Sequence, residues 1–270
     1  MIEYGFFRNA LAGILIISIA AAIIGTYVVT RRLVSIAGGV THACFGGLGL
    51  GYFLGLNPVA MAGAVAVASS LGVEWLARRH SVRRDSAVAV VWALGMAVGV
   101  LFVFLTPGYV PELNTFLFGN ILTIGSADLW AFGIYTVLLV VFYAACFPLV
   151  TACAFDPDFA RVRHLPVTLV TTVMTVFIAV GIVLTIRLVG VMLLMSMISL
   201  PQMVAETFTR RMRPMVLTAT AVSMTCCTGG LLLATRVDVP CSALIVLILV
   251  AAYAAARIVK AIKRPRRALV

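Results

Sequence analysis

The side chain with the clearest capacity for chemistry is His42, within the glycine-rich stretch 38–58. It is the only histidine inside an apolar segment, and seven glycines lie between Gly38 and Gly55. A neutral imidazole is a common ligand for zinc, copper, iron and nickel. An ionisable residue within a membrane span usually marks a functional site. His42 is therefore a candidate metal ligand. The structural alternative is a histidine hydrogen-bonded to a carbonyl of a neighbouring helix.

The residues around His42 suggest a path for a small solute. On a helix, Gly46 and Gly49 follow the histidine at i+4 and i+7, which would leave a groove without side chains beside the imidazole. We assign Gly38 and Thr41 to the same predicted translocation path. The alternative for Thr41 is a hydrogen bond to a carbonyl of its own helix.

Sulfur-containing residues are further candidates. Cys44 lies about 200° around an ideal helix from His42, so the two bind one ion only if the glycines unwind this turn. The alternative for Cys44, as for the other cysteines, is a small buried thiol, because the sequence has no CxxC pair and no disulfide spacing. Met192, Met195 and Met197 share one apolar span, where they either form a soft path for copper or fill space.

These side chains must be positioned by helices that cross a membrane. Hydrophobic residues make up 63% of the 270 residues and charged residues 11%, whereas soluble domains have about half and about a quarter. The long apolar runs predict an all-α, polytopic helical bundle in a lipid bilayer, with about nine spans near the ~20 residues needed to cross. Because the seventh is short, eight spans are the alternative. The predicted spans are 10–29, 38–56, 59–77, 87–105, 128–148, 166–186, 189–204, 215–234 and 241–259.

The charge distribution predicts the orientation of the chain. The net charge is +11, but the basic residues flank apolar spans instead of forming one stripe, which argues against a nucleic-acid partner. We predict a transmembrane domain over 1–259 and a basic cytoplasmic tail over 260–270. Positive residues stay in the cytoplasm, so the amino terminus is predicted outside and the carboxy terminus inside. One side of the predicted bundle holds 17 of the 20 Lys and Arg residues: Arg31, Arg32, Arg78, Arg79, Arg83, Arg84, Arg161, Arg163, Arg210, Arg211, Arg213, Arg257, Lys260, Lys263, Arg264, Arg266 and Arg267.

Two connections are predicted to contain structure of their own. Residues 106–127 are too long for a turn and too apolar for a solvated loop, so we predict a re-entrant or interfacial segment. Residues 149–165 form the largest cytoplasmic connection. Within it, Asp156 is a predicted N-cap and Pro157 the first residue of a short amphipathic helix.

Several kinds of chemistry are absent from the sequence. It has no GxxxxGK[ST] phosphate loop, no HExxH metalloprotease motif and no GxSxG nucleophile elbow. We therefore expect a protein that is not an enzyme and that does not hydrolyse ATP by the phosphate-loop route. One histidine and no mid-span carboxylate are also too few titrating groups for a proton relay.

Five blocks, in order along nearly the whole chain, resemble the membrane permeases of bacterial ABC importers for zinc, manganese or iron. The glycine-rich block resembles the second helix of that family, which carries a histidine at the His42 position. The blocks are RRLVSIAGGVTHACFGGLGLGYFLG (31–55), LFGNIL (117–122), AFDPDFARVRHLPV (154–167), VGVMLLMSMISLPQMVAETFTRR (189–211) and VDVPCSALIVLI (237–248).

The resemblance implies an all-α permease in the bacterial inner membrane that works as a homodimer. Its implied partners are cytoplasmic ATP-binding subunits, which hydrolyse ATP, and an external metal-binding protein. No permanently bound cofactor is implied, because the divalent metal is the transported substrate and His42 lies on or near its path. The segment implied to dock on the ATPase contains Phe155, Asp156, Pro157, Phe159 and Ala160.

The sequence departs from the family at two positions. Gly38 stands where the family commonly has an aspartate, and Asn120 replaces the aspartate of an LFGD-like block. Because manganese prefers carboxylate and other oxygen ligands, we expect zinc, with manganese or iron as alternatives. The competing functional class is a gradient-driven carrier or channel without an ATPase, and a third is a structural or assembly protein of the membrane.

Overall fold

The computed structural model describes residues 5–79, 83–107, 119, 121, 124–237 and 239–263, and this part of the chain consists of helices and short connections without a strand. The helices are α1 (Gly5–Thr30), α2 (Val34–Leu54), α3 (Pro58–Arg79), α4 (Arg84–Leu105), α6 (Ser126–Ala145), α7 (Phe147–Phe155), α8 (Pro157–Val162), α9 (Val167–Phe208), α10 (Met212–Val237) and α11 (Cys241–Lys263).

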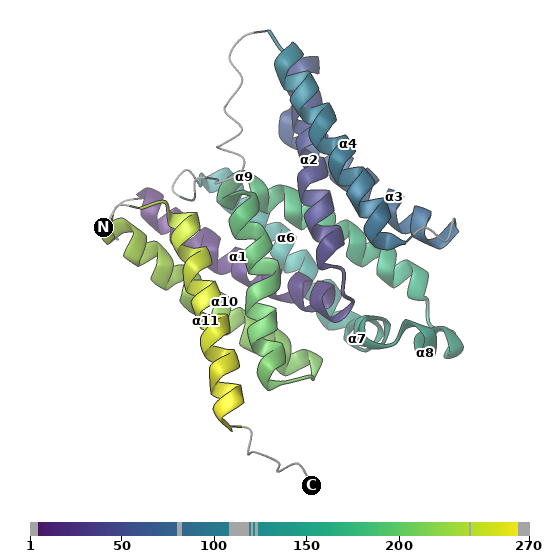
Figure 1. Ribbon diagram of the computed structural model, residues 1–270, viewed down its shortest axis with the longest axis vertical. Helices are drawn as coiled ribbons and strands as arrows, with labels where there is room; N and C mark the ends of the chain where they lie inside the picture. The colour runs from purple at the N-terminus through teal and green to yellow at the C-terminus, as the bar shows by residue number, and fades with distance from the viewer. Residues whose placement is uncertain are drawn as a thin grey trace.

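The described residues contain nine helices long and apolar enough to cross a membrane, which confirms the nine predicted spans and the helical bundle. Figure 1 shows α2, α3 and α4 standing together beside a larger group formed by α1, α6, α9, α10 and α11. Helix α1 lies inside this group, where it contacts α6, α9 and α10. Helix α2 packs against α3, α4 and α9, so it joins the two groups.

The sixth and seventh spans follow one another within α9 without a connecting loop. The helix is interrupted at Gly190. The φ of 76° and ψ of 169° at this residue belong to a region that is essentially restricted to glycine. Gly119 (φ 61°) packs directly on the break, and a Cβ on Gly119 would overlap the backbone of Val189 and Gly190. The spans Val167–Ile186 and Leu188–Phe208 are separated by Arg187, and Gly190 lies in the first turn of the second span, which is 21 residues long. The seventh predicted span is therefore a full span and not a short one.

A second irregularity in α9 is compensated by a side chain. Pro201 has no N–H, so it leaves the carbonyl of Met197 without its usual helical partner. The Gln202 Nε2 atom donates to Met197 O at 3.1 Å and to Ala21 O of α1 at 2.8 Å. Because a bilayer supplies no water to such carbonyls, Gln202 both repairs the helix and fastens α9 to α1.

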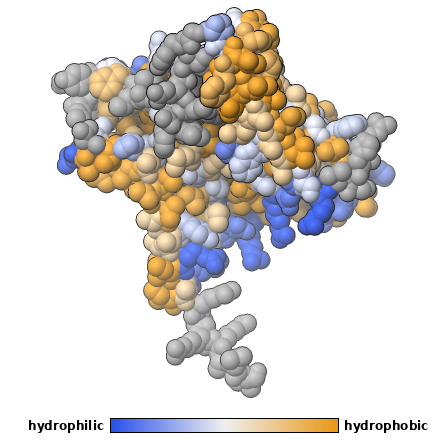
Figure 2. Space-filling model, turned by 45° about the horizontal axis from the view of Figure 1, so that its top comes forward, coloured by the Kyte–Doolittle hydropathy of each residue, from blue (hydrophilic) through white to orange (hydrophobic). Residues whose placement is uncertain are grey.

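The outer surface is suited to lipid. Apolar residues cover much of the face shown in Figure 2, with hydrophilic residues gathered along one edge. In α4 only 11% of the span is buried, and Val90, Leu94 and Phe104 are exposed by 62% or more. Exposed apolar helices are expected where the surrounding solvent is hydrocarbon, because nothing polar is needed on that face.

Two predictions cannot be compared with the structure throughout. The re-entrant or interfacial segment at 106–127 falls largely outside the described residues, and the structure resumes continuously with α6. The basic tail was predicted to begin at residue 260, but α11 continues to Lys263, and 264–270 lie outside the described residues.

Candidate metal path and coupling segment

Helix α2 owes its position to glycines that admit neighbouring backbones. A Cβ on Gly46 would lie 2.9 Å from the carbonyl oxygen of Gly95, and a Cβ on Gly49 would overlap that of Gly99. Small residues at such contacts let membrane helices approach closely. The groove predicted at Gly46 and Gly49 is thus occupied by the backbone of α4. In this conformation the two glycines provide a close helix contact rather than an open channel.

His42 projects from α2 toward α4 and is half-buried. Its ring stacks on Trp92, with the centroids 4.4 Å apart and the planes 7° from parallel. No described residue forms a hydrogen bond to the imidazole nitrogens. The structural alternative, a histidine bonded to a helix carbonyl, is therefore not realised among these residues. The stacking on Trp92 fixes the plane of the ring.

Gly38 and Thr41 lie on the side of α2 that faces α9. The Thr41 hydroxyl donates to Ala37 O at 2.7 Å, as its structural alternative predicted, and it also lies 3.7 Å from the sulfur of Met195. A Cβ on Gly38 would be 3.3 Å from Cε of Met195. From the sequence, Met195 was a candidate only together with Met192 and Met197, because its contact with Thr41 joins residues 154 positions apart.

Cys44 is not brought together with His42. The Cys44 side chain is fully buried, and its thiol donates to Val40 O at 3.0 Å. The described residues contain no cluster of three or more His, Cys, Asp or Glu side chains able to hold a metal ion. Among the described residues of one chain, a metal ion at this place would therefore meet fewer than three His, Cys, Asp or Glu side chains.

The short helix predicted after Asp156 is confirmed as α8. Asp156 caps it, because Oδ1 accepts hydrogen bonds from the N–H groups of Asp158 (3.2 Å) and Phe159 (2.9 Å), and Pro157 is the first helical residue. Phe155 and Phe159 are 50% and 55% exposed. The end of α7 and the first turn of α8 thus each present one exposed aromatic side chain.

Ala160 departs from the predicted docking set. It is fully buried in the main hydrophobic core, on the side of α8 that faces the bundle. In this conformation its methyl group supports α8 from beneath and offers no surface to a partner.

Two arginines hold α7, the helix that leads into α8. The Arg31 Nη1 atom, at the end of α1, donates to Cys153 O at 2.6 Å and so satisfies a carbonyl in the last turn of α7. Arg213 lies over the ring of Phe147 at 4.5 Å, at the other end of α7. Burial raises the pKa of the Cys153 thiol, and Arg31 partly opposes this, so the thiol stays protonated at neutral pH. From the sequence both arginines indicated only the orientation of the chain, because their partners are far away along it.

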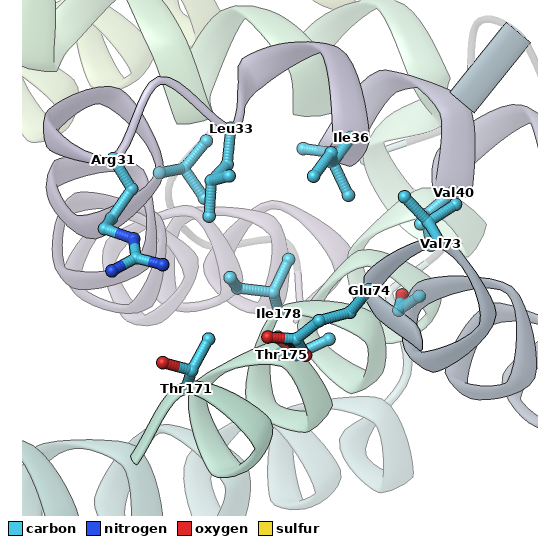
Figure 3. Close-up of a pocket in the computed structure, with 12 residues that line it drawn as sticks. Arg31, Leu33, Ile36, Val40, Val73, Glu74, Thr171, Thr175 and Ile178 are labelled. Carbon is cyan, nitrogen blue, oxygen red and sulfur yellow. Dashed lines mark hydrogen bonds between the residues drawn. The ribbon is translucent and has the colours of Figure 1, made fainter. Parts of the chain in front are cut away.

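Arg31 also borders a cavity of about 40 Å³ between α1, α2, α3 and α9. Figure 3 shows Glu74 of α3 reaching across it toward Thr175 of α9. The Thr175 hydroxyl donates to Oε2 of Glu74 at 3.4 Å. Because Arg31 contacts α7 on one side and this cavity on the other, it connects the α7–α8 segment with the beginning of α2.

Residues 3–260 match the profile of the family described as "ABC 3 transport family". The chain belongs to that family. A probable metal transport system membrane protein of Chlamydia pneumoniae is 33% identical over 90% of this chain and 85% of its own length. The manganese transport system membrane protein MntC of Listeria innocua is 24% identical over 81% and 78%.

Among solved structures, PsaBC from Streptococcus pneumoniae in complex with Fab contains a chain of the same fold. The TM-score is 0.83 at 20% sequence identity, and the match covers 94% of this chain and 91% of that chain. Together with the family match, this confirms the resemblance to metal ABC permeases that the five sequence blocks indicated, and it makes the chain a multi-pass membrane permease of this family.

Proposed function

We propose that this chain is the permease subunit of an ATP-driven importer that moves a divalent transition metal into the cell, with zinc as the preferred substrate. The observation that carries the proposal is His42, a half-buried imidazole within a membrane span that has no hydrogen-bond partner among the described residues and stacks on Trp92. An ionisable side chain inside a membrane span costs free energy, so such a residue is by default a candidate for a functional site.

The proposed importer contains two copies of this chain, two cytoplasmic ATP-binding subunits and an external metal-binding protein. The exposed aromatic side chains Phe155 and Phe159 suit the ATPase contact, because they expose apolar area at the end of the bundle where Arg31 and Arg213 lie. By the positive-inside rule this end is cytoplasmic in the bacterial inner membrane, so the amino terminus lies outside and the carboxy terminus inside.

In the proposed mechanism, His42 binds the ion only transiently. One or two contacts let an ion pass, whereas a closed four-ligand site would retain it. The close contacts of Gly46 and Gly49 with α4 let these helices move as packed units. Movement of α8 on the ATPase reaches α2 through α7 and the Arg31 bond to Cys153 O.

The test is the cellular metal content, measured by elemental analysis in a strain that relies on this chain and its ATPase. We expect one metal to accumulate with the wild type and accumulation to fall at least about tenfold in His42→Ala at equal membrane expression. Gly229→Ala serves as the control, because nothing lies within 4 Å of the added methyl group. Normal accumulation in His42→Ala contradicts the proposed path. Accumulation that survives loss of the ATPase favours the gradient-driven carrier instead.

A further inference from the structure

Helix α2 and the second half of α9 pack together and form one wall of the proposed path, so their role in selectivity rests on the proposed function. Gly38 precedes His42 by four residues, so both lie on one face of α2, one turn apart. The space that a Gly38 side chain would fill is taken by Met195, whose Cε lies 3.3 Å from the position of that Cβ. The Met195 sulfur is 3.7 Å from the Thr41 hydroxyl. Met195 is therefore held against the turn of α2 that carries the histidine.

The stripe of α9 around Met195 is open to the outside of the single chain. Met195 is half-buried, and Met192, about one turn away, is 43% exposed. The hydroxyls beside them donate to their own helix: Ser196 to Met192 O at 2.9 Å and Ser199 to Met195 O at 2.7 Å. Met195 packs against the edge of the main hydrophobic core without being fully buried, and Met192 lies at the surface.

This wall carries no acidic side chain near His42. Helix α2 contains no Asp or Glu, and beyond Gly190 the only carboxylate of α9 is Glu206. Glu206 follows Met195 by 11 residues, which is about 16 Å along a helix. Apart from hydroxyl and backbone oxygens, the donors on this turn of α2 and on the part of α9 that contacts it are the imidazole nitrogens of His42 and the thioether of Met195, which contacts Thr41 and the Gly38 position. Thioethers and imidazoles suit softer metals, whereas carboxylates and other oxygen donors suit manganese.

We propose that Met195 is a specificity-determining residue. Its thioether, together with the imidazole of His42, makes this wall selective for zinc and other soft divalent ions over manganese. The alternative is that Met195 only packs against Gly38. Leucine has nearly the same volume as methionine and no sulfur, so Met195→Leu separates the two roles without opening a cavity.

The experiment compares uptake of cadmium, a soft divalent probe, with uptake of manganese in cells that express the complete importer. We expect the wild type to favour cadmium, and Met195→Leu to lower the cadmium-to-manganese uptake ratio about tenfold, the effect of losing one ligand contact. The external protein and the ATPase are the same in every strain, so a changed ratio originates in the permease. Met224→Leu is the matched control, a half-buried methionine of α10.

A converse variant adds a hard ligand to the same place. In Gly38→Asp the new Cβ meets only the mobile end of the Met195 side chain. We expect the carboxylate to raise manganese uptake relative to cadmium, and we expect Gly38→Asn, with the same shape and no charge, to raise it much less.

The outcomes separate the inference from the proposed function. If the wild type accumulates no metal, the proposed function itself is overturned. If metal is taken up but Met195→Leu leaves the ratio unchanged, or lowers both metals equally, the selectivity role of Met195 is overturned while the permease function stands.

Discussion

The cap of α8 allows a quantitative test of how the permease couples to its ATPase. One carboxylate oxygen of Asp156 accepts both hydrogen bonds that begin this six-residue helix. Replacing an N-cap Asp by Ala costs about 1 kcal/mol, whereas Asn caps about as well as Asp. A helix this short has few other bonds to hold it. One kcal/mol lowers the population of its folded form about fivefold relative to the unfolded form.

We therefore expect Asp156→Ala to lower metal uptake by up to about fivefold at equal membrane expression, because α8 holds Phe159 in the right geometry beside Phe155 of α7 for a smaller share of the time. We expect Asp156→Asn and Asp156→Ser to stay close to the wild type. Co-purification of the ATPase with each variant measures the docking step directly, and uptake measures its consequence.

Two results would refute this reasoning in different ways. If Asp156→Asn is as defective as Asp156→Ala, the charge of the carboxylate matters, which indicates a contact with the partner and not a helix cap. If Asp156→Ala retains wild-type uptake and ATPase binding, the order of α8 does not limit coupling.

Three further predictions concern positions that fix the helices. Gly190→Ala should lower the free energy of unfolding by about 1–3 kcal/mol, because its backbone conformation is essentially glycine-only; a melting temperature as high as that of the control Gly229→Ala would contradict this. Arg31→Met should reduce uptake at normal expression by removing a charged hydrogen bond to α7, while Arg32→Met, at an exposed position, should not; equal uptake in the two variants would exclude the proposed role of α7. Gln202→Leu should lower the melting temperature of the detergent-solubilised protein, because it removes the bond to Ala21 O of α1, and an interhelical bond in a membrane contributes about 0.6 kcal/mol on average, together with the bond to Met197 O within α9; an unchanged melting temperature would show that these bonds add nothing net.

Local features of this chain were predictable because their causes are local. A span needs about 20 apolar residues whatever it packs against, so nine spans could be read from hydropathy and all nine are found. The Asp156 cap and Pro157 at the start of α8 depend on neighbouring residues only, and both are confirmed. The five blocks that indicated the family likewise depend on residue identity alone.

The candidate site was predictable only in part. His42 could be found because histidine is rare inside apolar spans, but nothing in the sequence indicated that Trp92 would stack on it. The groove expected at Gly46 and Gly49 was occupied by α4, since Gly95 and Gly99 offer a complementary small-residue surface. A row of glycines predicts a close approach equally well for a solute or for another helix.

The sequence by itself determined the class of protein, the number of spans and the capped helix α8, and it supplied His42 as the candidate ligand. The tertiary structure alone decided which side chains meet. Thr41 contacts Met195 across a separation of 154 residues, and Arg31 donates to Cys153 O across 122 residues. Apolar helices in a bilayer have no strong preference among partners from hydrophobicity, because lipid is as apolar as their own side chains. Shape and a few polar bonds select the partners, and these exist only once the helices are packed.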